Sequence, residues 1–184
     1  MKPVLIIIDI QNDYFPGGRM ELEGSPAASL QAAKLLESFR TKGLPLVHIQ
    51  HVSNRPGASF FLPDTEGVNI HANVAPRAGE TVLQKQFPNS FRGTALLEHL
   101  RALGADHLVV AGMMTHMCVD ATTRAAFDLG FSCSLAHDAC ATSALVFGEQ
   151  RVPAAQVHAA FVAALGGLYA KVQSAAEMAA EIAR

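Results

Sequence analysis

The feature that most constrains the fold is an unbroken aliphatic run near the start of the chain. Residues 4–8 read Val-Leu-Ile-Ile-Ile without polar alternation, and Asp9 follows directly. A strand with one solvated face alternates apolar and polar residues, whereas a strand covered on both faces does not. The run therefore predicts an interior strand of a parallel sheet, with helices packed on both sides.

The rest of the chain alternates between strand and helix patterns. Apolar runs predict strands at residues 4–8, 46–51, 81–85, 107–112, 131–136 and 168–172. Helical spacing and capping residues predict helices from Ser25 to a stop at Gly43, and at 94–103, 118–129, 153–165 and 174–184. This alternation favours an α/β fold, a three-layer α-β-α sandwich with a mostly parallel, doubly wound sheet of about six strands. Ligands of such sheets bind beyond the carboxyl ends of the strands.

Composition limits the organisation and the partners of the chain. With 184 residues, half of them apolar and 16% charged, residues 1–184 are expected to form a single domain. The net charge of −2 has no basic stripe, so we expect no nucleic-acid partner. No apolar run approaches the roughly 20 residues of a membrane span, so we expect no membrane partner.

Three cysteines, at positions 118, 133 and 140, form no Cys-x-x-Cys pair, and any disulfide would leave one of them unpaired. Such an arrangement suits a reducing compartment, and we predict a cytoplasmic protein.

A long irregular connection spans residues 52–80, rich in Pro and Gly and with little periodicity. A connection of this length is either disordered or functional. Because it contains Phe60 and Phe61, we expect an ordered segment beside a pocket, although the sequence leaves open a fixed wall or a mobile lid.

Three ionisable residues fall at the carboxyl ends of expected strands, namely Asp9, Lys85 and Cys118. Cys118 is expected at a strand-to-helix turn, where free amides favour ionisation of a thiol. A carboxylate can accept the thiol proton and an ammonium can hold the anion, so the trio could activate a sulfur nucleophile. Each residue also has a structural alternative: Cys118 as core packing, Asp9 as a turn cap and Lys85 as a solvated surface group.

Several motifs together resemble the isochorismatase-like cysteine hydrolase superfamily, and the resemblance runs over most of the chain. The matching segments are 8–13 (Ile-Asp-Ile-Gln-Asn-Asp), 70–71 (Ile-His), 79–85 (Gly-Glu to Lys), 90–94 (Ser-Phe, then Gly-Thr), 112–126 (Gly to Ala) and 137–141 (His-Asp-Ala-Cys-Ala).

The resemblance implies an Asp9, Lys85 and Cys118 triad, with Cys118 as nucleophile, Asp9 as general base and then acid, and Lys85 as the stabilising cation. It also implies a cis peptide bond between Met113 and Met114, and an oxyanion hole formed by the N–H groups of Met114 and Cys118. The implied reaction is hydrolysis of a C–N bond in a small amide, carbamoyl or ureide substrate through a thioester, by a homodimer or larger homo-oligomer.

Candidate substrate-binding residues are Phe15, His51 and His116, and a contact with a subunit partner is an equal alternative for His116. His51 and His71 could pair on a metal, but two histidines twenty residues apart are a weak pattern, and we expect no metal and no cofactor. Nicotinamidases of the superfamily carry an Asp-x-His signature where this chain has His51-Val52-Ser53. Isochorismatases proper lack a cysteine at the position of Cys118, which disfavours the vinyl-ether reaction.

Two other interpretations remain open at this point. A non-catalytic α/β protein could use Cys118 as a redox-sensing thiol, in which case Asp9 and Lys85 need no role. A dinucleotide-binding fold would share the alternating pattern, but no Gly-x-Gly-x-x-Gly follows the first strand, and it ranks last. The sequence does not identify the substrate.

Overall fold

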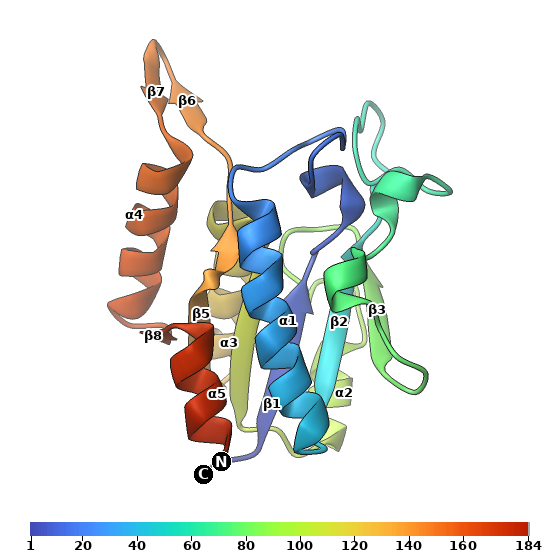
Figure 1. Ribbon diagram of the computed structural model, residues 1–184, viewed down its shortest axis with the longest axis vertical. Coiled ribbons are helices and arrows are strands. Elements are labelled where there is room, and N and C mark those ends of the chain that lie inside the picture. Colours follow the sequence, from blue (N-terminus) through green and yellow to red (C-terminus); the bar gives the residue numbers. More distant parts are fainter. Residues whose placement is uncertain (184) are drawn as a thin grey trace.

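The computed structural model describes residues 1–183, and its centre is a six-stranded sheet in the order β3-β2-β1-β4-β5-β8 (Figure 1). Every neighbouring pair in this sheet is parallel. The strands are β1 (Pro3–Ile8), β2 (Leu46–His51), β3 (Thr81–Lys85), β4 (His107–Met113), β5 (Ser132–Ala141) and β8 (Lys171–Gln173). The predicted α/β sandwich with a parallel sheet of about six strands is thus confirmed.

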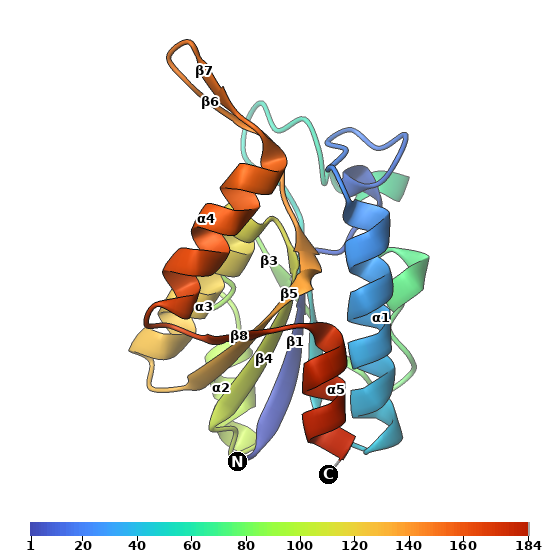
Figure 2. The same cartoon turned by 60° about the vertical axis from the view of Figure 1, so that its left-hand side comes forward.

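Helices cover both faces of the sheet, as Figure 2 shows. One face carries α1 (Ser25–Thr41) and α5 (Ala175–Ala183), and the other carries α2 (Leu96–Ala102), α3 (Asp120–Asp128) and α4 (Ala154–Gly166). The last residue of the predicted final helix, Arg184, lies outside the described residues. None of the helices in the described chain combines the length and apolarity needed to cross a bilayer.

The aliphatic run of β1 supplies a core on each face. Leu5 and Ile7 belong to the core under α1 and α5, whereas Val4, Ile6 and Ile8 belong to the opposite core. All five are at most 1% exposed, which is the physical reason for a run without polar alternation.

The chain reverses its direction across the sheet between β1 and β4. From β1 it proceeds through β2 to β3 at one edge, and from β4 it proceeds through β5 to β8 at the other. Gly112 allows the close approach of these two central strands, since a Cβ there would lie 2.1 Å from the Ile8 carbonyl oxygen, at a φ of 141°. The carboxyl ends of β1 and β4 therefore flank a topological switch point, where α/β sheets bind ligands.

Some expected element boundaries were wrong. The fifth strand continues to Ala141 instead of ending at residue 136, because a register shift between Val110 and Gly112 lets β5 pair further along β4. The last strand covers 171–173 and not 168–172. An unpredicted hairpin, β6 (Leu145–Phe147) and β7 (Gln150–Val152), projects beyond the carboxyl end of the sheet (Figure 1).

The connection of residues 52–80 is tied to the segment that follows β1. The carboxylate of buried Asp13 accepts hydrogen bonds from the N–H of Phe61 (2.6 Å) and of Arg19 (3.2 Å). The amide of buried Gln11 donates to the carbonyl oxygens of Val68 (2.7 Å) and His51 (2.9 Å). Two buried side chains thus hold the connection of residues 52–80 against the segment that follows β1.

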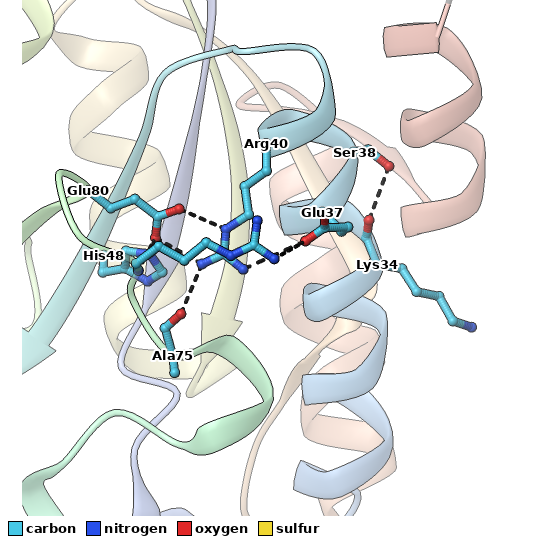
Figure 3. A network of polar contacts seen from close by, with 8 residues as sticks. Lys34, Glu37, Ser38, Arg40, His48, Ala75 and Glu80 are labelled. Atoms are coloured by element: carbon cyan, nitrogen blue, oxygen red, sulfur yellow. Dashed lines mark hydrogen bonds and ion pairs between the residues drawn. The ribbon is translucent and has the colours of Figure 1, made fainter.

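A polar network joins the last turns of α1 to the residue before β3 (Figure 3). The Arg40 guanidinium binds both carboxylate oxygens of Glu80, at 2.7 and 2.8 Å, and Arg40 also donates to the Ala75 carbonyl. The ring Nε2 of buried His48 lies 2.9 Å from Glu80 Oε2. Glu80 therefore connects a helix, strand β2 and the end of the long connection.

Candidate active site

The side chains of Asp9, Lys85 and Cys118 converge beyond the carboxyl ends of the strands. Lys85 Nζ lies 2.7 Å from Asp9 Oδ2, 3.1 Å from Cys118 Sγ and 3.0 Å from His51 Nδ1. It also donates to the Phe87 carbonyl oxygen at 3.1 Å. Asp9 is fully buried, Lys85 is 2% exposed and Cys118 is 5% exposed. An ammonium with this many acceptors is held in one position.

The sheet itself brings these residues together. Asp9 follows β1 with a φ of 49°, a left-handed conformation that is costly for a residue with a side chain and occurs often at functional sites. Lys85 ends β3 in register with His51, which ends β2. Cys118 follows β4, the strand next to β1. Parallel strands end at one edge, so residues far apart in sequence meet there.

Cys118 lies in a single π-helical turn, η4 (Thr115–Val119), and α3 begins only at Asp120. Cys118 therefore precedes the helix that the sequence predicts to begin at this residue, and burial acts against the thiolate that a helix start would favour. Burial and the neighbouring Asp9 carboxylate raise the pKa of the Cys118 thiol, and Lys85 offsets this only in part. The thiol is therefore protonated at neutral pH and needs a base to become a nucleophile.

The neighbouring cation and imidazole have defined charge states. Burial lowers the pKa of Lys85, but the Asp9 carboxylate and Cys118 outweigh it, so the pKa is raised and the ammonium stays charged. Burial and the Lys85 charge lower the pKa of His51 to about 4. Since an ammonium can only donate, neutral His51 accepts at Nδ1 and carries its proton on Nε2.

Metal binding can be judged from the ligand atoms that the site offers. Among the described residues, candidate ligand atoms of Asp9, His51 and Cys118 lie within 4.8 Å of one another. All three ligand atoms contact Lys85 Nζ. The ammonium group therefore occupies the position at which these atoms would hold a metal ion. His71 is not part of this group: its ring stacks on Phe15 with centroids 3.6 Å apart.

A small cavity of about 90 Å³ opens beside Cys118. Its apolar wall consists of Tyr14, Phe60, Phe61, Pro88, Met114 and Met117. Its polar wall consists of His51, Ser53, Asn54, Arg55 and Gln86. The long connection thus supplies much of the cavity wall, as the sequence predicts.

The other candidates lie in different places. His51 lines the cavity, but Phe15 and His116 are not among the described residues that do so. His116 instead bonds to Thr142 and contacts the Phe161 ring edge-on. The peptide bond between Met113 and Met114 is cis, and Met114 lies in the cavity wall.

Sequence reasoning missed Tyr14 and the role of Gln11. Tyr14 is 2% exposed and lines the cavity, and its ring meets Phe61 edge-on with centroids 4.6 Å apart. Burial raises the pKa of its phenol well above the ordinary value, with smaller contributions from Cys118 and Asp9. The sequence signal for this region is the group of polar residues that follows the buried strand β1. Polar side chains buried there need hydrogen-bond partners, so they indicate a segment that packs against another part of the chain.

Comparison with known proteins gives consistent matches over most of the chain. The family model described as "Isochorismatase domain" matches residues 3–177. The isochorismatase family protein YddQ of Bacillus subtilis (strain 168) is 50% identical, covering 95% of this chain and 97% of that protein. Maleamate amidohydrolase of Pseudomonas putida KT2440 is 35% identical, over 71% of this chain and 68% of that enzyme.

A solved structure agrees with the fold in detail. The crystal structure of a protein from Oleispira antarctica, named as an isochorismatase hydrolase, superposes on this chain with a TM-score of 0.94. The two sequences are 51% identical, and the match covers 97% of this chain and 96% of that one. The family match, the close relative and the shared fold together show that this chain belongs to the isochorismatase family of hydrolases.

Proposed function

We propose that the protein is a cysteine amidohydrolase that cleaves the C–N bond of a small amide, carbamoyl or ureide substrate. The observation that carries this proposal is the position of Lys85 Nζ, in contact with both Asp9 and Cys118, where Cys118 lines a cavity. The arrangement places an acceptor for the thiol proton and a fixed cation beside one sulfur atom.

In the first half of the proposed reaction, the Cys118 sulfur attacks the acyl carbon while Asp9 takes the thiol proton. The fixed Lys85 ammonium stabilises the charge that develops on the sulfur. The backbone N–H groups of Met114 and Cys118 are assigned to the oxyanion, since donors aimed at developing charge give the largest electrostatic stabilisation in acyl transfer. Asp9 then gives its proton to the leaving nitrogen, and ammonia or an amine departs.

In the second half, water attacks the thioester carbon and Asp9 accepts a proton from that water. The C–S bond breaks, the sulfur takes this proton from Asp9, and the acid product leaves. One amide and one water thus yield one acid and one amine, and the site returns to its starting protonation state.

Relatives support an amide substrate over other hydrolase substrates. One relative, of which the match covers more than two thirds, is named maleamate amidohydrolase. Nothing in the comparisons favours the redox-sensing alternative, and a buried thiol with a raised pKa holds little of the thiolate that oxidation requires.

The test is a screen of small primary amides, carbamoyl compounds and ureides for ammonia release. Cys118→Ala is expected to lose activity by a factor of at least about 1,000, because no other group forms the thioester. Cys133→Ala is the matched control: this thiol is also buried, with its pKa raised to about 12 by burial, and it lies in β5 away from the cavity wall. Full turnover by Cys118→Ala would overturn the proposal.

A further inference from the structure

The polar wall of the cavity offers hydrogen-bond donors that the protein itself does not use. Ser53, Asn54 and Arg55 lie shortly after the end of β2 at His51, and Gln86 follows β3. Within residues 1–183, none of these four side chains makes a hydrogen bond or an ion pair. Unused donors around a concave site are available to a ligand.

Arg55 is the one uncompensated charge of this wall among the described residues. No Asp or Glu side chain of the part of the chain that the structure describes lines the cavity, and the buried Asp9 and Lys85 charges cancel one another at 2.7 Å. The field of Arg55 reaches the interior of the site, since it contributes to lowering the pKa of His51 after burial and the Lys85 charge. The cavity is therefore electropositive at its polar side.

From this geometry we infer that the substrate is a short amide carrying a carboxylate, which Arg55 binds while the amide carbon faces Cys118. A guanidinium presents two parallel N–H donors that match the two oxygens of a carboxylate. Asn54 and Ser53 add neutral donors next to it, and the cavity volume of about 90 Å³ fits a short chain. The inference rests on the proposed function for the reaction and assigns the substrate class.

The charges of the wall also select against a positive substrate. Among the described residues no Asp or Glu side chain lines the cavity to balance a cation, and a positively charged substrate would meet Arg55. Repulsion and desolvation thus disfavour cationic amides.

Three amides of similar length and different charge test the inference: succinamate (negative), succinamide (neutral) and β-alaninamide (positive). In the native protein kcat/KM should fall in that order. Arg55→Gln should lower kcat/KM for succinamate by at least about tenfold, mostly through KM, because a charge-assisted contact is lost. It should change the value for succinamide by less than about twofold. Arg55→Lys should restore part of the preference.

Arg101→Gln is the matched control, since Arg101 is an exposed arginine of α2 away from the cavity. It should leave all three values unchanged. An unchanged ratio of succinamate to succinamide in Arg55→Gln would overturn the inference and leave the amidohydrolase proposal intact.

A binding assay separates this inference from the reaction. Succinate should slow the alkylation of Cys118 by iodoacetamide in the native protein, and Arg55→Gln should lose that protection. If no amide is hydrolysed, the proposed function fails, yet protection that depends on Arg55 still supports the anion site. Absent protection, or equal protection in both proteins, would overturn it.

Discussion

At the scale of single residues, the site depends on a balance of charge around one sulfur atom. Asp9 raises the pKa of the Cys118 thiol, second to burial, whereas Lys85 lowers it. A permanently ionised thiol would not need Asp9, but a protonated one does. The same carboxylate that holds the thiol neutral is thus placed to remove its proton when a substrate arrives.

This balance gives Asp9→Asn two opposite effects. Hydrolysis should fall by at least about 100-fold, because the general base is lost. Alkylation of Cys118 by iodoacetamide at pH 8 should become faster than in the native protein, because removing the negative charge lowers the thiol pKa while Lys85 remains.

The measurement is the pH dependence of the alkylation rate beside the rate of ammonia release, with Cys118→Ser to show that the signal belongs to this thiol. A structural role for Asp9 would slow both reactions together. Retained hydrolysis in Asp9→Asn would contradict its assignment as the base.

At the scale of elements, the Glu80 network ties α1 and β2 to the start of β3. The side chain of Glu80 is 14% exposed, and that of Arg40 is 13% exposed. The hydrogen bonds from Arg40 are the largest cause that lowers the Glu80 pKa, to about 2 from its ordinary value of 4.5. A carboxyl group with a depressed folded-state pKa stabilises the fold above its unfolded pKa, and this contribution is lost as pH falls toward 2.

Glu80→Gln should therefore lower the free energy of unfolding by about 2 kcal/mol at pH 7, since it leaves Arg40 with a weaker partner. The expected decrease in Tm is about 4 to 8 °C for a chain of this size. The difference from the native protein should shrink below pH 4.5, and thermal unfolding followed by circular dichroism at several pH values measures it.

Glu37→Gln serves as the control for this network. Its side chain is 55% exposed and forms ion pairs with Arg40 (Figure 3) and with Arg77. Surface pairs contribute little, so the change should stay within about 0.5 kcal/mol. Equal losses in the two variants would show that net charge, and not the buried contact, sets the stability.

At the scale of the whole molecule, the layers and the convergence of the site follow from local patterns. The unbroken run of β1 predicted a sheet covered on both faces, and parallel strands oblige Asp9, Lys85 and Cys118 to share one edge. Both features can be predicted from the hydrophobic pattern of each strand and from the residue at which the strand ends.

Details that depend on long-range contacts were beyond such reasoning. The extension of β5 requires the register shift beside Gly112, which no local pattern of β5 reveals. The sequence predicts Phe15 as a substrate-binding residue, yet its neighbour Tyr14 lines the cavity, because a short 3-10 turn (Asn12–Tyr14) sets which ring faces inward. The thiol pKa depends on how deeply Cys118 is buried, and the sequence does not state depth.

Covalent catalysis by Cys118 is the central step of the proposed reaction, and trapping the acyl-enzyme tests it most directly. Native protein would be mixed with the amide that it hydrolyses fastest, quenched in acid at millisecond intervals, and mapped by peptide mass spectrometry. We predict that the peptide containing Cys118 gains the mass of the acyl group during turnover and that the same peptide in Cys118→Ala gains none. An acyl group on a peptide without Cys118, or turnover with Cys118 unmodified at every quench time, would contradict covalent catalysis by Cys118.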